Sequence, residues 1–151
     1  MDSTRHIFLV DDDLFSINLY RQVLENIGYK NISTFQNASI ALYNLEKRPS
    51  VIFLDHHMND ISGVEVLKKI KKFDSSIYVV MISGQEKIQV AFDAIKFGAF
   101  DYIVKGESAE EKMRDVLSRI EKSADAHLGD HPKFMDKIKG IFGKHDESSS
   151  D

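Results

Sequence analysis

Several apolar segments of this chain end in side chains suited to handling phosphate. These are Asp11, Asp12 and Asp13 after residues 7–10, Asp55 after residues 51–54, Ser83 after residues 77–82 and Lys105 after residues 100–104. Crowded carboxylates repel one another unless a cation compensates, and their hard oxygen atoms suit Mg²⁺. A hydroxyl donor and an ammonium nearby could hold a phosphoryl group. These carboxylates, the hydroxyl and the ammonium together predict transfer of a phosphoryl group onto a carboxylate. Asp55 is the natural acceptor because it is the one carboxylate directly after its apolar segment.

The apolar segments alternate with segments of helical spacing, which predicts five strand–helix units. Continuous apolar runs are typical of strands covered on both faces, whereas mixed runs are typical of sheet edges. The continuous runs are residues 7–10, 51–54 and 77–82, and the mixed runs are residues 32–35 and 100–104. We therefore predict an α/β fold, a doubly wound five-stranded parallel sheet of the flavodoxin-like order 2-1-3-4-5. Gly28 and Gly98 stand where the first and fourth helices should end.

This strand order determines which side chains meet. The first and third strands are neighbours at the topological switch point, where ligands bind beyond the carboxyl ends of the strands. We therefore expect Asp11, Asp12 and Asp55 to converge there, and a divalent cation is implied.

Composition narrows the function classes. The 151 residues suffice for one domain with a sizeable core and a tail, and 42% hydrophobic content is ordinary for a soluble protein. A net charge of −4 argues against direct nucleic-acid binding. Without cysteine, thiolate nucleophiles and zinc–thiolate sites are excluded. The four apolar residues near the start are too few for a signal peptide or a membrane span, so we expect a cytoplasmic protein.

Four motifs, in this order and spacing, resemble the response-regulator receiver domain of two-component signalling. They are Phe8-Leu9-Val10-Asp11-Asp12-Asp13, Asp55-His56-His57-Met58-Asn59-Asp60-Ile61-Ser62-Gly63, Met81-Ile82-Ser83-Gly84 and Gly98-Ala99-Phe100-Asp101-Tyr102-Ile103-Val104-Lys105. The resemblance covers residues 5–122, and four motifs together are far more specific than one. It identifies the chain as a receiver, and because the chain has no room for a separate output domain we expect the stand-alone, single-domain type.

The resemblance implies a role for each acidic residue of the site. Asp55 is the phosphoacceptor. Asp12 and Asp55 ligate Mg²⁺ with help from the backbone carbonyl of His57, and Asp11 acts largely through a metal-bound water. Asp13 is expected to be only a polar entry to the first helix.

The resemblance also implies a switch. Ser83 hydrogen-bonds the phosphoryl oxygen, Lys105 pairs with it, and Tyr102 is the switch aromatic. Inward movement of Ser83 leaves room for Tyr102 to turn inward, which changes the surface formed by residues 86–122. On its residues alone, Tyr102 is more typical of an amphipathic edge-strand aromatic without a switching role.

Three positions depart from the family pattern. Asn59 and Gly106 replace the usual prolines, and Gly84 replaces the commoner alanine. Receivers typically hold the bond after the lysine cis, which costs roughly 3–4 kcal/mol without proline, so we expect a trans bond and a looser aim for Lys105. The fourth and fifth loops should be more mobile.

The adjacent histidines allow two interpretations. Consecutive side chains leaving a strand point opposite ways, which disfavours a shared transition-metal site at His56 and His57. The His57 side chain, together with Gln85, occupies a position that in receivers tunes hydrolysis of the aspartyl phosphate. We expect replacement of His57 to change the phosphoryl lifetime several-fold.

Residues 123–151 lie outside the resemblance. Residues 123–132 are typical of a linker and residues 146–151 of a disordered end. Between them, residues 133–142 carry apolar side chains at helical spacing with interleaved lysines, which allows a short amphipathic helix. This segment could pack on its own domain, fray, dock a partner, form a homodimer or lie on a membrane surface.

The leading functional interpretation is a phosphorelay signalling protein. It accepts phosphate from a sensor histidine kinase or a histidine phosphotransfer protein, signals to an unknown output protein through altered contacts, and is not an enzyme beyond its own phosphorylation and dephosphorylation. A receiver-fold binding module that acts without phosphorylation is the alternative. A Mg²⁺-dependent phosphatase is disfavoured because His57 stands where aspartyl-phosphate hydrolases commonly carry a second Asp.

Overall fold

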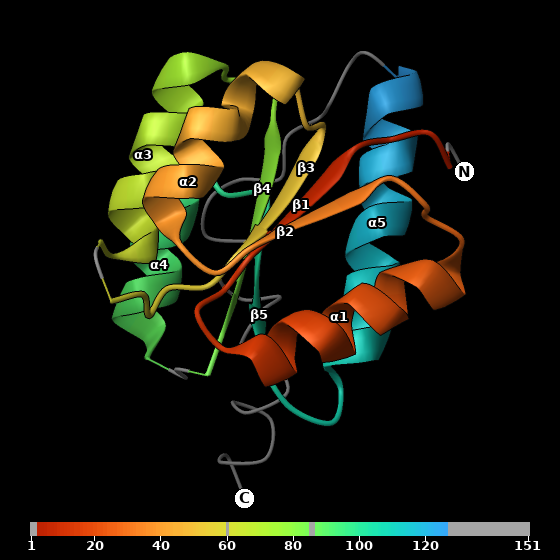
Figure 1. Ribbon diagram of the computed structural model, residues 1–151, viewed down its shortest axis with the longest axis horizontal. Helices are drawn as coiled ribbons and strands as arrows, with labels where there is room; N and C mark the ends of the chain where they lie inside the picture. Colours follow the sequence, from red (N-terminus) through yellow and green to blue (C-terminus); the bar gives the residue numbers. More distant parts are fainter. Residues whose placement is uncertain (1–2, 60, 85–86, 127–151) are drawn as a thin grey trace, which may run out of the picture.

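The structure is a computed structural model that describes residues 3–59, 61–84 and 87–126 (Figure 1). Its centre is a five-stranded parallel sheet of order β2-β1-β3-β4-β5. The strands are β1 (Ile7–Val10), β2 (Ile32–Phe35), β3 (Val51–Leu54), β4 (Tyr78–Ser83) and β5 (Asp101–Val104). The predicted strand order and both predicted edge strands are confirmed.

Five helices cover the two faces of this sheet. They are α1 (Leu14–Ile27), α2 (Ala38–Tyr43), α3 (Gly63–Phe73), α4 (Ile88–Lys96) and α5 (Ala109–Ala126), and a 3₁₀ turn, η1 (Asn44–Lys47), follows α2. In Figure 1, α1 and α5 lie on one side of the sheet and α2, α3 and α4 on the other. No helix within the described ranges is long and apolar enough to cross a membrane.

Each face of the sheet has its own hydrophobic core, because successive strand residues point to opposite faces. Phe8 and Val10 of β1 pack in the core beneath α2, α3 and α4, whereas Ile7 and Leu9 pack in the core beneath α1 and α5. All four side chains are almost completely buried. This explains why β1 is a continuous apolar run in the sequence.

The ends of the helices follow the expected local chemistry. Asp13 is the N-cap of α1, where its side chain accepts a hydrogen bond from the backbone N–H of Phe15, so its predicted role at the helix entry is confirmed. Gly28 and Gly98 adopt left-handed φ angles of 119° and 104° just past α1 and α4, also as predicted.

The last helix extends beyond the receiver boundary expected from the sequence. Residues 123–126, the first part of the expected linker, continue α5. The rest of that linker, the amphipathic segment at residues 133–142 and the acidic end at residues 146–151 lie outside the described residues.

Candidate functional site

Parallel pairing of β1 with β3 brings the acidic residues together. Val10 is in register with Leu54, so the next residues, Asp11 and Asp55, leave the sheet side by side. The Asp55 N–H donates to the Val10 carbonyl at 2.9 Å, which extends this pairing to the site. One carboxylate oxygen from each of Asp11, Asp12 and Asp55 lies within 4.8 Å of the others. The predicted convergence at the switch point is confirmed.

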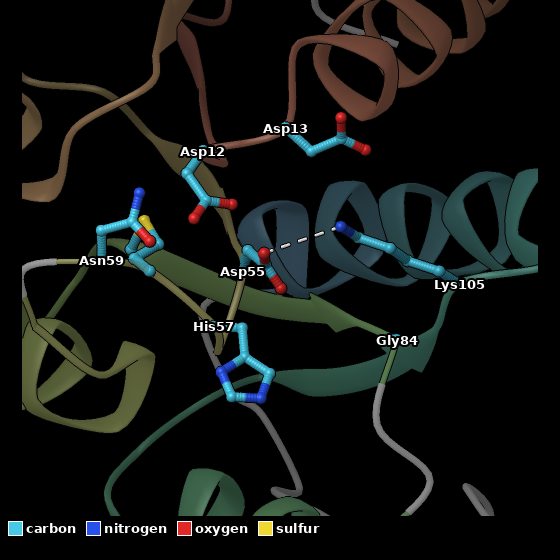
Figure 2. A pocket seen from close by; sticks show the side chains of 8 residues that line it. Asp12, Asp13, Asp55, His57, Asn59, Gly84 and Lys105 are labelled. Carbon is cyan, nitrogen blue, oxygen red and sulfur yellow. Dashed lines mark ion pairs between the residues drawn. The ribbon is translucent and has the colours of Figure 1, made fainter.

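An open hollow of about 530 Å³ lies over these carboxylates (Figure 2). The residues that line it come from the loops that follow the strands: Asp12, Asp13, Asp55, His57, Met58, Asn59, Gly84 and Lys105. Asp11 is only 5% exposed and lies behind them. The hollow therefore has an acidic floor, and Lys105 provides a basic side chain in its wall.

Lys105 reaches across the site from the end of β5. Its Nζ lies 2.7 Å from Asp11 Oδ2 and 3.6 Å from Asp55 Oδ2, the pair marked by the dashed line in Figure 2. It also donates to Ser16 Oγ at 3.2 Å. The backbone N–H of Lys105 donates to the Ser83 carbonyl at 2.9 Å and thereby continues the β4–β5 pairing. The lysine is thus held within reach of the Asp55 carboxylate.

The electrostatics of the site disfavour ionisation of Asp55 beside Asp11. Burial, reinforced by the negative charge of Asp11, raises the pKa of Asp55 to about 6, although Lys105 acts in the opposite direction. Burial tends to lower the pKa of Lys105, but its hydrogen bond to Asp11 and the charges of both carboxylates leave that pKa raised overall. A divalent cation would relieve this repulsion, and carboxylate oxygens are suitable ligands for Mg²⁺.

Ser83 and Tyr102 lie in the core beneath the rim of the hollow. Ser83 is completely buried and Tyr102 is 2% exposed. Burial raises the pKa of the Tyr102 hydroxyl, while a hydrogen bond with Ser83 acts in the opposite direction. The two residues predicted to act as a pair are therefore in contact. Neither lines the hollow itself.

The loop after Lys105 has a conformation that proline could not adopt. The structure has no cis peptide bond among its described residues, so the Lys105–Gly106 bond is trans, as predicted. Gly106 has a φ of 149°, which favours glycine, whereas proline is restricted to about −65°. The looser aim of Lys105 and the mobile loops stay predictions, and Gln85 lies outside the described residues.

The two histidines differ in their relation to the site. His57 lines the hollow, and its backbone N–H hydrogen-bonds the Asp55 carboxylate and lowers the pKa of that group. Within the described ranges, Asp11, Asp12 and Asp55 are the one group of three or more His, Asp or Glu side chains close enough to share an ion. That the His57 carbonyl ligates a metal stays a prediction.

Sequence reasoning missed Ser16, the hydroxyl that touches Lys105. Ser16 lies on α1, is 6% exposed, and follows the N-cap residue Asp13 by three positions. That spacing placed it one helical turn from a charged residue of the site, which was the available signal. Asn59 and Met58 were quoted as motif residues without a role, and the structure places both in the wall of the hollow.

The doubly wound sheet with carboxylates and a lysine at its carboxyl edge matches one class of protein. The model of the response regulator receiver domain matches residues 7–118, and the chain belongs to this family. The recognition of a receiver and its place in phosphorelay signalling, both predicted from the sequence, are confirmed at the level of the family.

Its relatives include short and long proteins. The chemotaxis protein CheY of Bacillus subtilis is 30% identical over 118 residues, which cover 78% of this chain and 95% of CheY. The nitrogen assimilation regulatory protein NtrX of Azorhizobium caulinodans is 38% identical over 107 residues, which cover 69% of this chain. The chain spans 23% of NtrX and 22% of another relative, the transcriptional regulatory protein ZraR of Klebsiella oxytoca.

Solved structures show the same architecture. CheY in the CheX–CheY–BeF3–Mg²⁺ complex of Borrelia burgdorferi superposes with a TM-score of 0.70 at 27% identity, covering 77% of this chain and 89% of that one. A CheY-like receiver domain of Methanospirillum hungatei has a TM-score of 0.74 at 22% identity, covering 82% and 98%, which supports the fold alone.

Proposed function

We propose that this protein accepts a phosphoryl group on Asp55 from a sensor histidine kinase or a histidine phosphotransfer protein. The observation that carries the proposal is the position of Asp55: it lies within 4.8 Å of two other carboxylates, and Lys105 Nζ lies 3.6 Å away. Such a site combines a carboxylate nucleophile with positive charge, and phosphoryl transfer needs mainly positioning and charge stabilisation.

The group transfer involves one bond formed and one broken. An oxygen of the Asp55 carboxylate attacks phosphorus, the bond between phosphorus and the donor histidine nitrogen breaks, and that nitrogen keeps the electron pair while the imidazole takes up one proton from solvent and leaves as neutral histidine. Lys105 remains protonated and pairs with the phosphoryl oxygens, while the Ser83 hydroxyl donates a further hydrogen bond. No proton needs to leave Asp55, because the carboxylate reacts in its ionised form.

Asp11, Asp12 and Asp55, with the backbone carbonyl of His57, would hold Mg²⁺. The fit rests on the clustering of their oxygens and on the raised pKa of Asp55, which comes first from burial and then from the negative charge of Asp11. When bound, the ion supplies charge neutralisation at the phosphoryl oxygens. The Borrelia CheY complex, which contains BeF3 and Mg²⁺, supports this assignment by similarity.

The output would be a change of protein contacts. Ser83, drawn toward the phosphoryl group, would alter the packing of Tyr102, the proposed switch aromatic, and with it the surface formed by residues 86–122. The protein would therefore not be an enzyme beyond its own phosphorylation and dephosphorylation. We assign residues 5–122 to the receiver, residues 123–151 to an extension, and a cytoplasmic location to the protein.

The proposal is tested by phosphorylation with acetyl phosphate and Mg²⁺, followed by intact-mass measurement. We expect wild type to gain one phosphoryl group and Asp55→Asn to gain none. Asp115→Asn, which changes an exposed carboxylate on α5 outside the site, is the matched control and should behave as wild type.

Two results would contradict the proposal. If wild type gained no phosphoryl group, the phosphorylation-independent binding module would be favoured. If inorganic phosphate were released rapidly and repeatedly without accumulation of a phosphorylated protein, a phosphatase would be favoured.

A further inference from the structure

A buried hydroxyl on α1 lies next to the lysine of the site. Ser16 is 6% exposed and is separated from Lys105 by 89 residues in the sequence. Its Oγ accepts a hydrogen bond from Lys105 Nζ at 3.2 Å and donates one to Asp13 Oδ2 at 2.8 Å. The proposed function so far uses neither contact.

These contacts restrict the direction of the lysine ammonium. An ammonium has three N–H donors on a flexible stem, so one partner leaves it free to rotate. Here Asp11 Oδ2 lies 2.7 Å from Nζ and Ser16 Oγ lies 3.2 Å from it. These two partners leave one of the three N–H donors, and Asp55 Oδ2 lies 3.6 Å from Nζ.

The Ser16 hydroxyl is itself held in place. A serine hydroxyl has one hydrogen and rotates to suit its surroundings, and here that hydrogen is directed to Asp13. Its lone pairs are consequently left for Lys105. Asp13 is fixed in turn, since its carboxylate accepts from the N–H of Phe15 and its own N–H donates to Asp11 Oδ1 at 2.9 Å. The hydrogen bond from Ser16 is also the largest cause of the lowered pKa of Asp13.

The residue after Lys105, Gly106, has no side chain that could help to hold the lysine in place. Gly106 has a φ of 149° and no side chain, and a Cβ added there would meet nothing within 4 Å. No side chain packs directly after Lys105, where the backbone of Gly106 instead hydrogen-bonds Tyr20 and Ala109, whereas α1 is anchored in the core by buried residues such as Ile17 and Tyr20. The contact with Ser16 therefore ties the Lys105 ammonium to a buried helix.

We propose that Ser16 is a positioning residue that aims the Lys105 ammonium at the phosphoryl group on Asp55. It acts through the lysine and does not touch the reacting atoms. The inference rests on the proposed function of Asp55, and it assigns Asp13 the further task of orienting the Ser16 hydroxyl.

The first test compares Ser16→Ala, which removes the hydroxyl, with Ser16→Thr, which keeps it. Ser118→Ala, on the exposed face of α5, controls for a serine-to-alanine change in a helix. Each variant is phosphorylated with acetyl phosphate at saturating Mg²⁺, with Mg²⁺ affinity and thermal unfolding measured alongside. We expect Ser16→Ala to react about three- to tenfold more slowly, the effect of losing one hydrogen bond to a charged group, with Mg²⁺ affinity unchanged. Ser16→Thr should restore most of the rate.

The second test does not require phosphorylation. In protein labelled with ¹⁵N-lysine, an ammonium held by hydrogen bonds exchanges its protons slowly and gives a cross-peak, which Lys105→Arg would assign. We expect this signal in wild type and Ser16→Thr and its loss in Ser16→Ala. The affinity of each protein for fluoroberyllate with Mg²⁺ should fall in the same order.

The outcomes separate the two proposals. If wild type were not phosphorylated, the proposed function would fail, while the ammonium signal would still test the contact. If wild type were phosphorylated and Ser16→Ala matched it in rate and in the ammonium signal, the positioning role would be overturned. A loss of rate in Ser16→Ala that only followed a loss of Mg²⁺ affinity and stability would also overturn it, since that pattern indicates a structural role.

Discussion

At the scale of single residues, Asp55 is a carboxylate whose surroundings oppose its ionisation. It is 3% exposed, and burial with the charge of Asp11 raises its pKa to about 6. A carboxyl group whose pKa is higher in the folded than in the unfolded protein stabilises the fold at low pH, and that contribution is lost as the pH rises through the folded value. Asp55, the proposed phosphoacceptor, is therefore a residue that weakens the fold at neutral pH.

This gives a prediction for the metal-free protein. Asp55→Asn removes the charge, so we expect it to be more stable than wild type at pH 7.5 by roughly 2 kcal/mol, and the difference should shrink toward pH 4. Urea unfolding in the presence of EDTA at several pH values would measure the difference. Glu46→Gln, an exposed carboxylate on η1, should show no comparable effect. A less stable Asp55→Asn at pH 7.5 would contradict the prediction.

The sequence was sufficient to predict most of the clustered residues. Asp11, Asp12, Asp55 and Lys105 each stand directly after an apolar run, and parallel strands bring such positions to one edge. Ser16 could not be found in the same way. Its contact with Lys105 depends on how α1 sits against β5, which no local pattern encodes. A serine in the first turn of a helix is ordinarily explained by the preference of serine for helix ends.

At the scale of elements, the start of α3 constrains the loop that carries Asp55. The backbone N–H of Gly63 donates to the His56 carbonyl at 2.8 Å. A Cβ at position 63 would lie 2.5 Å from the Asp55 carbonyl oxygen and 2.6 Å from His56 Cα. Only glycine permits this approach of helix to strand end, so α3 holds the loop that carries Asp55 against the sheet.

Gly63→Ala tests this packing. Because the obstructing atoms belong to the backbone, we expect a loss of stability of about 1–3 kcal/mol and a slower reaction with acetyl phosphate. Gly84→Ala is the matched control, since a Cβ there would meet nothing within 4 Å, and it should keep wild-type stability. Denaturant unfolding and the phosphorylation rate provide the two measurements. Equal stability of the two variants would show that the loop can move away.

The elements themselves were largely predictable, and the deviations have local causes. The apolar runs predicted every strand, with β4 and β5 each beginning one residue later than the runs. The second helix, for which the sequence predicts only helical spacing, tightens to the 3₁₀ turn η1 after Tyr43 and ends at Arg48, whose φ is 54°. Period-based reasoning identifies the apolar face of a helix, but it cannot separate α from 3₁₀ geometry over one turn.

At the scale of the whole molecule, the sheet divides the interior in two. Tyr102 belongs to the core beneath α2, α3 and α4, whereas its neighbour Ile103 belongs to the core beneath α1 and α5. Both side chains are at most 2% exposed. Adjacent residues of one strand thus pack in different cores.

A matched pair of variants tests this division. Tyr102→Leu and Ile103→Val each reduce the volume of a buried side chain and should each cost about 1 kcal/mol or more. We expect Tyr102→Leu to increase native-state hydrogen exchange chiefly in α4, and Ile103→Val to increase it chiefly in α5. The same pattern of exchange in both variants would show that the two cores are not independent.

The position of Tyr102 on one side of the sheet has a consequence for the direction of a signal. If Tyr102 is the proposed switch, a rearrangement that begins at its phenol would first change the packing of the layer that contains α4. A partner that recognises α1 would then be insensitive to the state of Tyr102, while one that recognises α4 would respond. Binding on α1 and binding on α4 would then differ in one respect, since only binding on α4 would depend on phosphorylation of Asp55.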